Sequence, residues 1–498
     1  MKLLFYCCLL SLLLSCKASY KNYSLYKKYP KQQLQEDYQL LRNILEKKHP
    51  SVYWYTSKDS MDKYFEKFYR AIGDSMTEQQ FGWKIIAPLI DKIHCGHTSF
   101  AMSKEYNKWV QNKRFPSFPL FMKVWNDTMV VTANLNKKDT VLKKGFFIKS
   151  INGINNKEII KTLFEYMPED GYANNVNYIR LSNNFPYYHR NIFGLSKHYT
   201  IRYSDITGRE QTINVPLFEI PKDTSKKNKI IPIKKDTIIV VKKSRKQIQL
   251  QRINEIRSLV IDSSNNTAII TLNTFATGRL RKFFRQTFRY IKKANITNTI
   301  IDLRNNGGGK INLSTLLTRY VTRIPFKVAD TAFAVARSLG CYTKYIKEGF
   351  LNNIALAFIT QKRKDGLYHF THWEKKVYTP KKNNHFNGNL YILISGSTFS
   401  ASTLFCNTMK SQPGVQLIGE ETGGGWHGNN GIMIPDITLP NTKLRIRLPL
   451  FRLVQYNHIP KTGSGVLPDI YISTDYDALV KGIDKKMQVV MEIIKAKN

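Results

Sequence analysis

The sequence predicts a multidomain α/β protein, because the chain is long, rich in apolar residues and repeats a strand, loop and helix pattern in its second half. Its 498 residues are about three times the ~150 of one ordinary domain, so we expect two to four domains. Hydrophobic residues make up 42% and aromatic residues 12% of the chain. This composition supports sizeable cores and excludes a disordered, collagen-like or disulfide-stapled small protein.

The chain is strongly basic, with 77 Lys and Arg against 36 Asp and Glu and a net charge of +41. Such a charge creates a positive surface field that attracts anionic partners. Nucleic acid, phospholipid and cell-wall polymers are all anionic, so the charge alone does not choose among them. The N-terminal residues indicate the cellular compartment.

The first sixteen residues, MKLLFYCCLLSLLLSC, have the form of a bacterial lipoprotein signal. Lys2 precedes a short apolar run that ends in Leu13-Leu14-Ser15-Cys16, and the cysteine of such a box is acylated when the signal is cut. The run is too short for a membrane-spanning helix, which needs ~20 residues. An uncleaved anchor or a plain secretory signal is the alternative, and both also export the protein.

We therefore expect a protein of the bacterial cell envelope, anchored through a lipid on Cys16 and either periplasm-facing or surface-exposed. In that compartment the basic surface meets membrane or cell-wall anions, and we expect no nucleic-acid partner. Cys95, Cys341 and Cys406 remain as ordinary cysteines, which cannot all pair. Without a C-x-x-C spacing they predict no disulfide framework and no metal site, and we expect buried thiols.

Changes in composition and periodicity divide the chain. Apolar residues at helical spacing, as in Tyr38, Leu41, Ile44 and Leu45, predict a helical N-terminal domain. The expected order is signal peptide 1–16, tether 17–30, helical domain 31–112, β-rich domain 115–218, basic linker 219–257, α/β domain 258–475 and C-terminal helix 476–498. The Lys-rich stretch is predicted to be a solvated connector, with a patch for anionic lipid or polymer as the alternative.

The β-rich segment 115–218 resembles a PDZ domain. The resemblance is clearest in GFFIKSINGINNKEIIKTL, where a strand, the tight turn Asn152-Gly153 and a helix follow one another. PDZ domains bind chain ends by adding a strand to a sheet edge. The resemblance implies that a substrate end pairs beside residues 145–148 and is thereby led toward the catalytic part of the chain.

The α/β segment contains two strand, loop and helix units whose loops contain candidate catalytic groups. NTIIDLRNNGGGKINLSTLLTRYV ends its strand in a glycine loop, and NLYILISGSTFSASTLFCNTMKS ends its strand in a turn of small residues. Ser400 in the second turn is the best candidate for a nucleophile, because a serine between a buried strand and a helix can be exposed beside free backbone amides. The glycine loop 307–309 could supply further amides to an oxyanion.

Four motifs in order look like the core of the tail-specific (carboxy-terminal-processing) and tricorn-like serine peptidases. They are NTIIDLRNNGGG, TFSAS, IGEETGGG and SGVLPDIYI, and the similarity extends over about 115–475. The stretch ETGGGWHGNNGIMIPDITLPNTKLRIRLP resembles exported, often lipidated members from Bacteroidetes-type bacteria. The resemblance implies a ClpP/crotonase-like α/β catalytic core, peptide or protein substrates and no cofactor.

The resemblance also implies roles for individual residues. Ser400 maps to the nucleophile, and the amides of Ala401 and of Gly308 or Gly309 map to the oxyanion hole. Tail-specific members use a lysine as base, where this chain has Gly425, so a lysine placed there is expected to recreate a dyad.

Tricorn-like members instead use a histidine ahead of the PDZ module. His97 matches that position, with His94 as a near alternative. The carboxylate that orients this histidine maps to Thr462, so its partner is unexplained, and we consider Glu420 or Glu421 as substitutes. A further candidate base is His427 in GGGWHG, although a histidine after a tryptophan is more often packed.

Two functions follow from these residues. The first is an exported serine endopeptidase, in which Ser400 attacks a peptide carbonyl and His97 transfers the proton. The second is a catalytically silent, lipid-anchored peptide-binding protein of the same fold. The missing lysine and orienting acid favour the silent protein, whereas the serine turn, the glycine loop and His97 favour the enzyme. Substrate identity and oligomeric state are not predicted.

Overall fold

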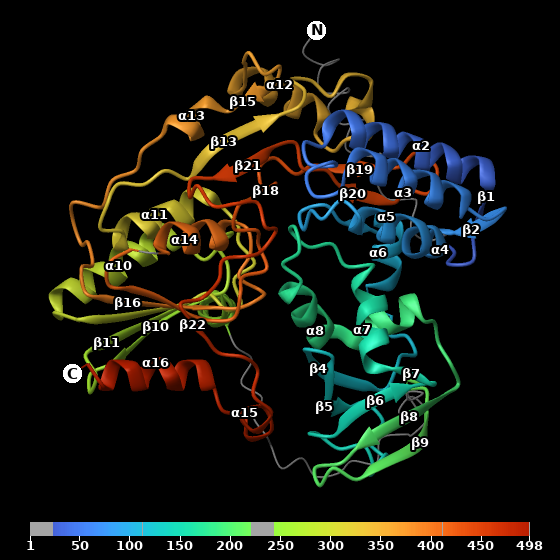
Figure 1. Cartoon of the computed structure of the whole chain (residues 1–498), viewed down its shortest axis with the longest axis horizontal. Coiled ribbons are helices and arrows are strands. Elements are labelled where there is room, and N and C mark those ends of the chain that lie inside the picture. The colour runs from blue at the N-terminus through green and yellow to red at the C-terminus, as the bar shows by residue number, and fades with distance from the viewer. Residues whose placement is uncertain (1–22, 112, 221–243, 411, 498) are drawn as a thin grey trace.

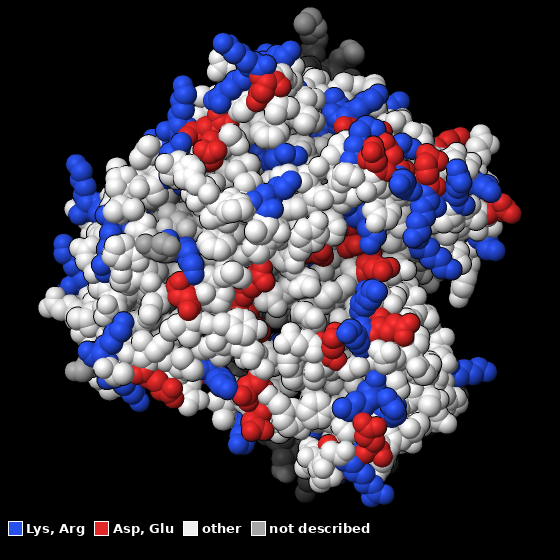
Figure 2. Space-filling model, in the orientation of Figure 1, with Lys and Arg blue, Asp and Glu red and all other residues white. Residues whose placement is uncertain are grey.

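A computed structural model describes residues 23–111, 113–220, 244–410 and 412–497 of the chain (Figure 1). Cys16, the signal peptide and the first part of the tether lie outside the described residues, as does 221–243 of the basic linker. In the described part of the chain, every helix is too short or too polar to cross a membrane. Figure 2 shows Lys and Arg side chains scattered over one face among Asp and Glu, rather than gathered in one patch.

The N-terminal region is helical, as the periodicity predicts. Tyr38, Leu41, Ile44 and Leu45 all lie on the buried side of one helix. The elements are β1 (Lys28–Pro30), α2 (Lys31–Lys48), α3 (Lys58–Arg70), β2 (Ser75–Thr77), α4 (Glu78–Phe81), the π-helical turn η1 (Gly82–Ile86), α5 (Ala87–Asp91), β3 (Phe100–Ala101) and α6 (Lys104–Val110). The end of the expected tether is structured, because β1 pairs with β2.

This helical region does not have a core of its own. Its buried side chains form one cluster with apolar residues from about 326–356 and 432–453 of the α/β segment. Strand β3 also extends a small sheet with β19 (Asp436–Thr438) and β20 (Arg445–Arg447). Asp37 adds a polar connection, since its carboxylate accepts the backbone N–H groups of Asn441 and Thr442 at 2.9 and 2.8 Å. The N-terminal helices are therefore fixed to the α/β core.

The β-rich segment is an antiparallel sheet with its own core, in the strand order β4-β5-β6-β8-β9. Its elements are β4 (Leu120–Trp125), β5 (Thr128–Asn134), β6 (Phe147–Ile151), β7 (Ile154–Asn155), α7 (Asn156–Phe164), α8 (Asn175–Ile192), β8 (His198–Ser204) and β9 (Glu210–Pro216). Asn152 and Gly153 form the expected turn with positive φ values of 50° and 82°. Helix α8 was not expected from the sequence, and its backbone is non-helical at Asn184, two residues before Pro186.

The position expected for strand addition is occupied. Phe147 and Ile148 pair with β5 on one side and with β8 on the other. A substrate end therefore finds no free backbone edge beside residues 145–148, and this expectation is wrong. The reason is topological, since a strand in the middle of a sheet has both of its hydrogen-bonding edges filled.

The α/β segment is built on a six-stranded sheet in the order β10-β11-β12-β16-β17-β22. All neighbouring strands are parallel except β10 and β11. The elements are β10 (Arg257–Asp262), β11 (Thr267–Leu272), α10 (Leu280–Lys293), β12 (Asn298–Asp302), α11 (Ile311–Val321), β16 (Asn389–Ile394), α14 (Ala401–Met409), β17 (Val415–Gly419) and β22 (Ile470–Tyr471). Helices α10, α11 and α14 cover one face, and α16 (Lys485–Lys495) covers the other (Figure 1).

A second, smaller sheet lies between this core and the N-terminal helices, with the order β14-β15-β13-β21-β18. The remaining elements are α9 (Arg245–Ile256), β13 (Ala329–Ala334), the 3₁₀ turn η3 (Gly340–Tyr345), α12 (Gly349–Ile359), β14 (Gln361–Lys362), β15 (Tyr368–His369), α13 (Thr371–Lys375), β18 (Gly428–Asn429), β21 (Arg452–Gln455) and α15 (Tyr476–Lys481).

Three sequence expectations need correction. The last dozen residues of the expected linker are not a connector but form helix α9, which a capping box at Ser244 begins. The expected C-terminal helix is two helices, α15 and α16. Cys95 and Cys406 are buried as expected, but Cys341 is exposed, because it lies in the surface turn η3.

Candidate active site

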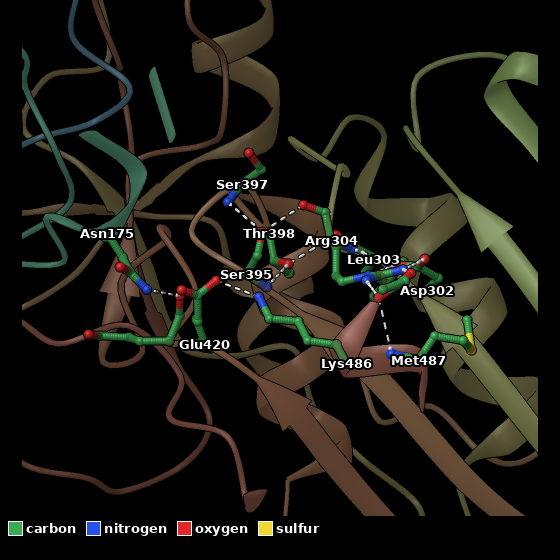
Figure 3. Close-up of polar contacts among 12 residues, drawn as sticks. Asn175, Asp302, Leu303, Arg304, Ser395, Ser397, Thr398, Glu420, Lys486 and Met487 are labelled. Carbon is green, nitrogen blue, oxygen red and sulfur yellow. Dashed lines mark hydrogen bonds and ion pairs between the residues drawn. The ribbon is translucent and has the colours of Figure 1, made fainter. Parts of the chain in front are cut away.

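The two loops singled out in the sequence meet because their strands are neighbours. β12 and β16 pair in parallel, so both loops leave the sheet at the same edge. Hydrogen bonds join the loops: Thr398 Oγ1 donates to the carbonyl of Leu303 at 2.9 Å, and Ser395 Oγ donates to the carbonyl of Arg304 at 2.6 Å (Figure 3). Phe399 N–H donates to the carbonyl of Asn306 at 3.1 Å. The serine turn is thus fixed on the glycine loop.

Ser400 occupies a sharp turn between β16 and α14. It is the residue that precedes the helix, and its φ of 54° and ψ of −119° are rare for a residue with a side chain. Strain of this kind costs of order 1–3 kcal/mol and is typical of sites where a side chain must be presented to a substrate. A serine on a strained strand-to-helix turn is a recurring arrangement for a nucleophile.

Gly308 lies directly against this turn. Its φ is 97°, and a Cβ at this position would lie 2.7 Å from the carbonyl oxygen of Phe399 and 3.0 Å from the amide nitrogen of Ala401. Only glycine fits this approach. The structure therefore brings Gly308 and Ala401 to Ser400, as the sequence predicts for an oxyanion hole.

The individual amides of the glycine loop differ in what they bind. The N–H of Gly308 already donates to Asn306 Oδ1 at 3.0 Å. Within the described residues the N–H of Gly309 and that of Ala401 have no hydrogen-bond acceptor. Both amides are therefore available to bind an oxyanion.

His97 faces Ser400 across a small space beside Gly431. A Cβ on Gly431 would lie 3.1 Å from Ser400 Oγ and 3.2 Å from His97 Nε2, so both atoms border the same point. His97 is buried at 5% exposure, and its ring packs on Phe399 with a centroid distance of 4.7 Å. Residues that are about 300 positions apart in the sequence thus meet at one site.

Asp170 supplies the carboxylate that the sequence did not reveal. Its Oδ1 lies 3.5 Å from His97 Nδ1, and its side chain is 4% exposed. The N–H of Gly96 donates to Oδ1 at 2.8 Å, and that of Gly425 donates to Oδ2 at 3.4 Å. These bonds hold the carboxylate in place. The only local signal was an acid pair ahead of a glycine in PEDG, because the contact with His97 is formed by tertiary structure alone.

The carboxylates that the sequence suggested as partners of His97 bind other groups. Glu420 pairs with Lys486 of α16, as Figure 3 shows. Glu421 accepts the backbone N–H of Gly465 at 2.6 Å, and burial raises the pKa of its carboxyl group. Thr462 bonds to Ser464. Within the described residues neither glutamate contacts His97, so their proposed role as its partner is wrong.

The alternative histidines have other partners. His94 Nδ1 lies 3.3 Å from Glu169 Oε1. His427 Nδ1 donates to the carbonyl of Ile459 at 3.0 Å, and its ring packs against Trp54. Across the described parts of the chain, neither histidine has a contact with Ser400.

The expectation that a lysine at position 425 would recreate a dyad is wrong for a steric reason. A Cβ on Gly425 would lie 2.6 Å from the carbonyl oxygen of Gly428, which is backbone and cannot move aside cheaply. The same Cβ would lie 3.4 Å from the Cβ of Asp170. A lysine would therefore distort the loop whose Gly425 N–H binds the Asp170 carboxylate.

No group of three or more His, Cys, Asp or Glu side chains in the described ranges is arranged to hold a metal ion. The candidate site itself offers a hydroxyl, an imidazole, a carboxylate and free backbone amides. This set is complete for acyl transfer through a serine nucleophile.

Comparison with known proteins identifies the α/β segment. Residues 266–472 match the family model described as "Peptidase family S41". Two structures of mature CPAF, one of them complexed with lactacystin, share the fold with TM-scores of 0.63 and 0.62, at 12% sequence identity. Each similarity covers 94% of this chain and 98% or 99% of the CPAF chain. No curated protein sequence matches the chain.

At this identity the CPAF structures establish a shared multidomain α/β fold and nothing about substrates. The family match covers the segment that carries the glycine loop, the serine turn and the strands that bring them together. Residues 266–472 are thus similar to peptidase family S41, a family of serine-type peptidases that act on peptide or protein substrates.

Proposed function

We propose that this chain is an exported, lipid-anchored serine endopeptidase that cleaves peptides or protein tails. The observation that carries the proposal is the convergence of Ser400 Oγ and His97 Nε2 on one point beside Gly431, with Asp170 behind the imidazole. Ser400 attacks the substrate carbonyl, and His97 accepts its proton and then protonates the leaving amine. The N–H groups of Ala401 and Gly309 stabilise the oxyanion.

Asp170 acts as a positioning residue in this mechanism. With its oxygens fixed by the amides of Gly96 and Gly425, it favours the His97 tautomer that carries the proton on Nδ1. That tautomer leaves Nε2 free to accept the Ser400 proton. The negative charge of Asp170 also stabilises the imidazolium that forms during attack.

The catalytically silent peptide-binding protein is the second candidate, and one observation favours it. Within the described residues neither ring nitrogen of His97 makes a hydrogen bond, and the 3.5 Å separation from Asp170 is long for one. Catalytic hydrogen bonds often shorten only when substrate is bound, so this geometry is also that of an unliganded peptidase.

The first prediction separates these two candidates. Ser400→Ala should abolish peptide hydrolysis and fluorophosphonate labelling, and His97→Ala should lower the rate by ~10²–10⁴-fold because the hydroxyl loses its base. His427→Ala is the matched control and should keep the wild-type rate and pH profile. Hydrolysis and labelling are measured across pH for all four proteins. Wild-type protein that neither cleaves nor labels would establish the silent protein instead.

The second prediction concerns the orienting acid. Asp170→Asn keeps an oxygen for the amide of Gly96 but removes the charge, so kcat should fall by roughly 10²–10⁴-fold with little change in KM. The neighbouring Glu169→Gln is the control and should stay within a few-fold of wild type. Steady-state kinetics of both variants test this. An Asp170→Asn enzyme with wild-type kcat would show that His97 has no need of the carboxylate.

The third prediction uses the space between nucleophile and base. Gly431→Ala places a methyl group near 3 Å from both Ser400 Oγ and His97 Nε2 and should block proton transfer, with a loss of at least about 100-fold in hydrolysis. Gly73→Ala is the control, because only Met76 lies within 4 Å of its added Cβ. Circular dichroism checks that both variants are folded. An active Gly431→Ala enzyme would mean that the two side chains do not react across this point.

The fourth prediction tests export and anchoring. The short apolar run ending in Leu13-Leu14-Ser15-Cys16 supports acylation of Cys16 and fractionation with membranes. Mass analysis of the mature N-terminus should find the lipid on Cys16, and Cys16→Ala should release the protein into the soluble fraction. Cys8→Ala serves as the control. A mature terminus elsewhere, without lipid, contradicts the anchor but leaves the peptidase proposal intact.

A further inference from the structure

A cavity of about 410 Å³ lies beside the catalytic residues. Gly96 and Phe399 line it, and these residues directly precede His97 and Ser400 in the sequence. Most of the remaining wall is aromatic or apolar. Its rings are those of Trp83, Phe100, Tyr166, Tyr187, Tyr188 and Phe399. A substrate residue next to the scissile bond would therefore have a side-chain pocket within reach.

The aromatic wall is rigidly packed. Trp83 packs edge-on against Phe100 at 5.0 Å and against Tyr187 at 5.7 Å between ring centroids. The aromatic wall is built from different parts of the chain, since Trp83 lies in η1 and Tyr187 in α8. A preformed pocket loses little conformational entropy when it is filled, which favours its use for selectivity.

Arg180 is one of two charged groups in this wall, and Arg447 is the other. Arg180 lies on α8 and is partly buried. Its Nη1 donates to the carbonyl of Pro168 at 2.7 Å and to Asn177 Oδ1 at 2.9 Å. In the described part of the chain, its Nε and Nη2 have no acceptor. One edge of the guanidinium is thus available to a ligand.

Nothing in the wall neutralises this charge. No Asp or Glu lines the cavity, and Arg180 forms no ion pair within the described residues. Glu169 lies nearby, but its two oxygens face Asn177 at 2.8 Å and His94 at 3.3 Å. Burial lowers the pKa of Arg180, and the nearby carboxylates of Glu169 and Asp170 offset this effect only in part. A second guanidinium, that of the exposed Arg447, also lines the cavity.

We propose that this cavity is a specificity pocket for an acidic side chain of the substrate, whose carboxylate binds the free edge of Arg180. The inference rests on the proposed function, because it assigns a substrate class to the same catalytic site. The aromatic walls contact the methylene groups of the acidic residue, and Arg180 supplies the donors for its carboxylate. An uncharged aromatic side chain is the rival occupant.

Binding to the full-length Ser400→Ala protein tests the pocket without relying on catalysis. Fluorescently labelled octapeptides carry Glu, Gln or Phe at each position in turn, and anisotropy gives their dissociation constants. At one position we expect Glu to bind roughly 10- to 100-fold more tightly than Gln, because a hydrogen bond to a charged partner is involved. Adding Arg180→Gln to the Ser400→Ala protein should bring the ratio of the two dissociation constants, for the Gln and the Glu peptide, close to one.

Arg190→Gln is the matched control, since it removes the same charge from the same helix outside the pocket and should keep the ratio. Arg180→Lys should retain part of the preference. If Arg180 serves only to hold the carbonyl of Pro168, Arg180→Gln weakens all peptides equally, which overturns the inference. Equal binding of Glu and Gln peptides at every position, or tighter binding of Phe, also overturns it.

Hydrolysis by the chain with Ser400 intact is measured on the same peptides and separates the two proposals. A preference for Glu without any hydrolysis supports the pocket and contradicts the peptidase function. Hydrolysis without a preference for Glu supports the peptidase function and overturns the pocket.

Discussion

The close approach of Gly308 to the turn that carries Ser400 is the constraint on which the rest of the site depends. A Cβ on Gly308 would lie within 3 Å of the backbone on both sides of Ser400, so no other residue fits there. The approach is possible because β12 and β16 are parallel neighbours, and hydrogen bonds from Thr398 and Ser395 fix it. The strained backbone of Ser400 persists because its surroundings determine it on all sides.

His97 and Asp170 come from outside the α/β sheet, so their placement depends on how the parts of the chain pack. His97 follows the N-terminal helices, which share one apolar core with the second sheet. Asp170 precedes α8 of the β-rich domain and binds the amides of Gly96 and Gly425. Movement of the β-rich domain would therefore move the carboxylate relative to the imidazole.

The segment with the C-terminal helices α15 and α16 also connects the β-rich domain with the α/β core. Arg304, just after β12, binds Asp302, as Figure 3 shows, and it also binds Asp484. Burial by itself would raise the pKa of Asp484, but the Arg304 guanidinium outweighs this effect and lowers it. Tyr476 of α15 donates to the carbonyl of Gly145 in the β-rich domain at 2.8 Å. The segment 475–486 thus contacts both the β-rich domain and the strand end that leads into the glycine loop.

The sequence by itself determined the features that depend on neighbouring residues. The helical spacing of Tyr38 to Leu45, the turn at Asn152-Gly153 and the alternation of strands, small-residue loops and helices are local patterns, and they located Ser400 and Gly308 correctly beside each other. Only the tertiary structure decided that Asp170, and not a glutamate near the glycine loop, lies behind His97. It also decided that residues 145–148 have no free edge and that Arg180 lines a cavity next to Ser400. These contacts join residues far apart in the chain, and one sequence contains no local period or spacing that encodes such distances.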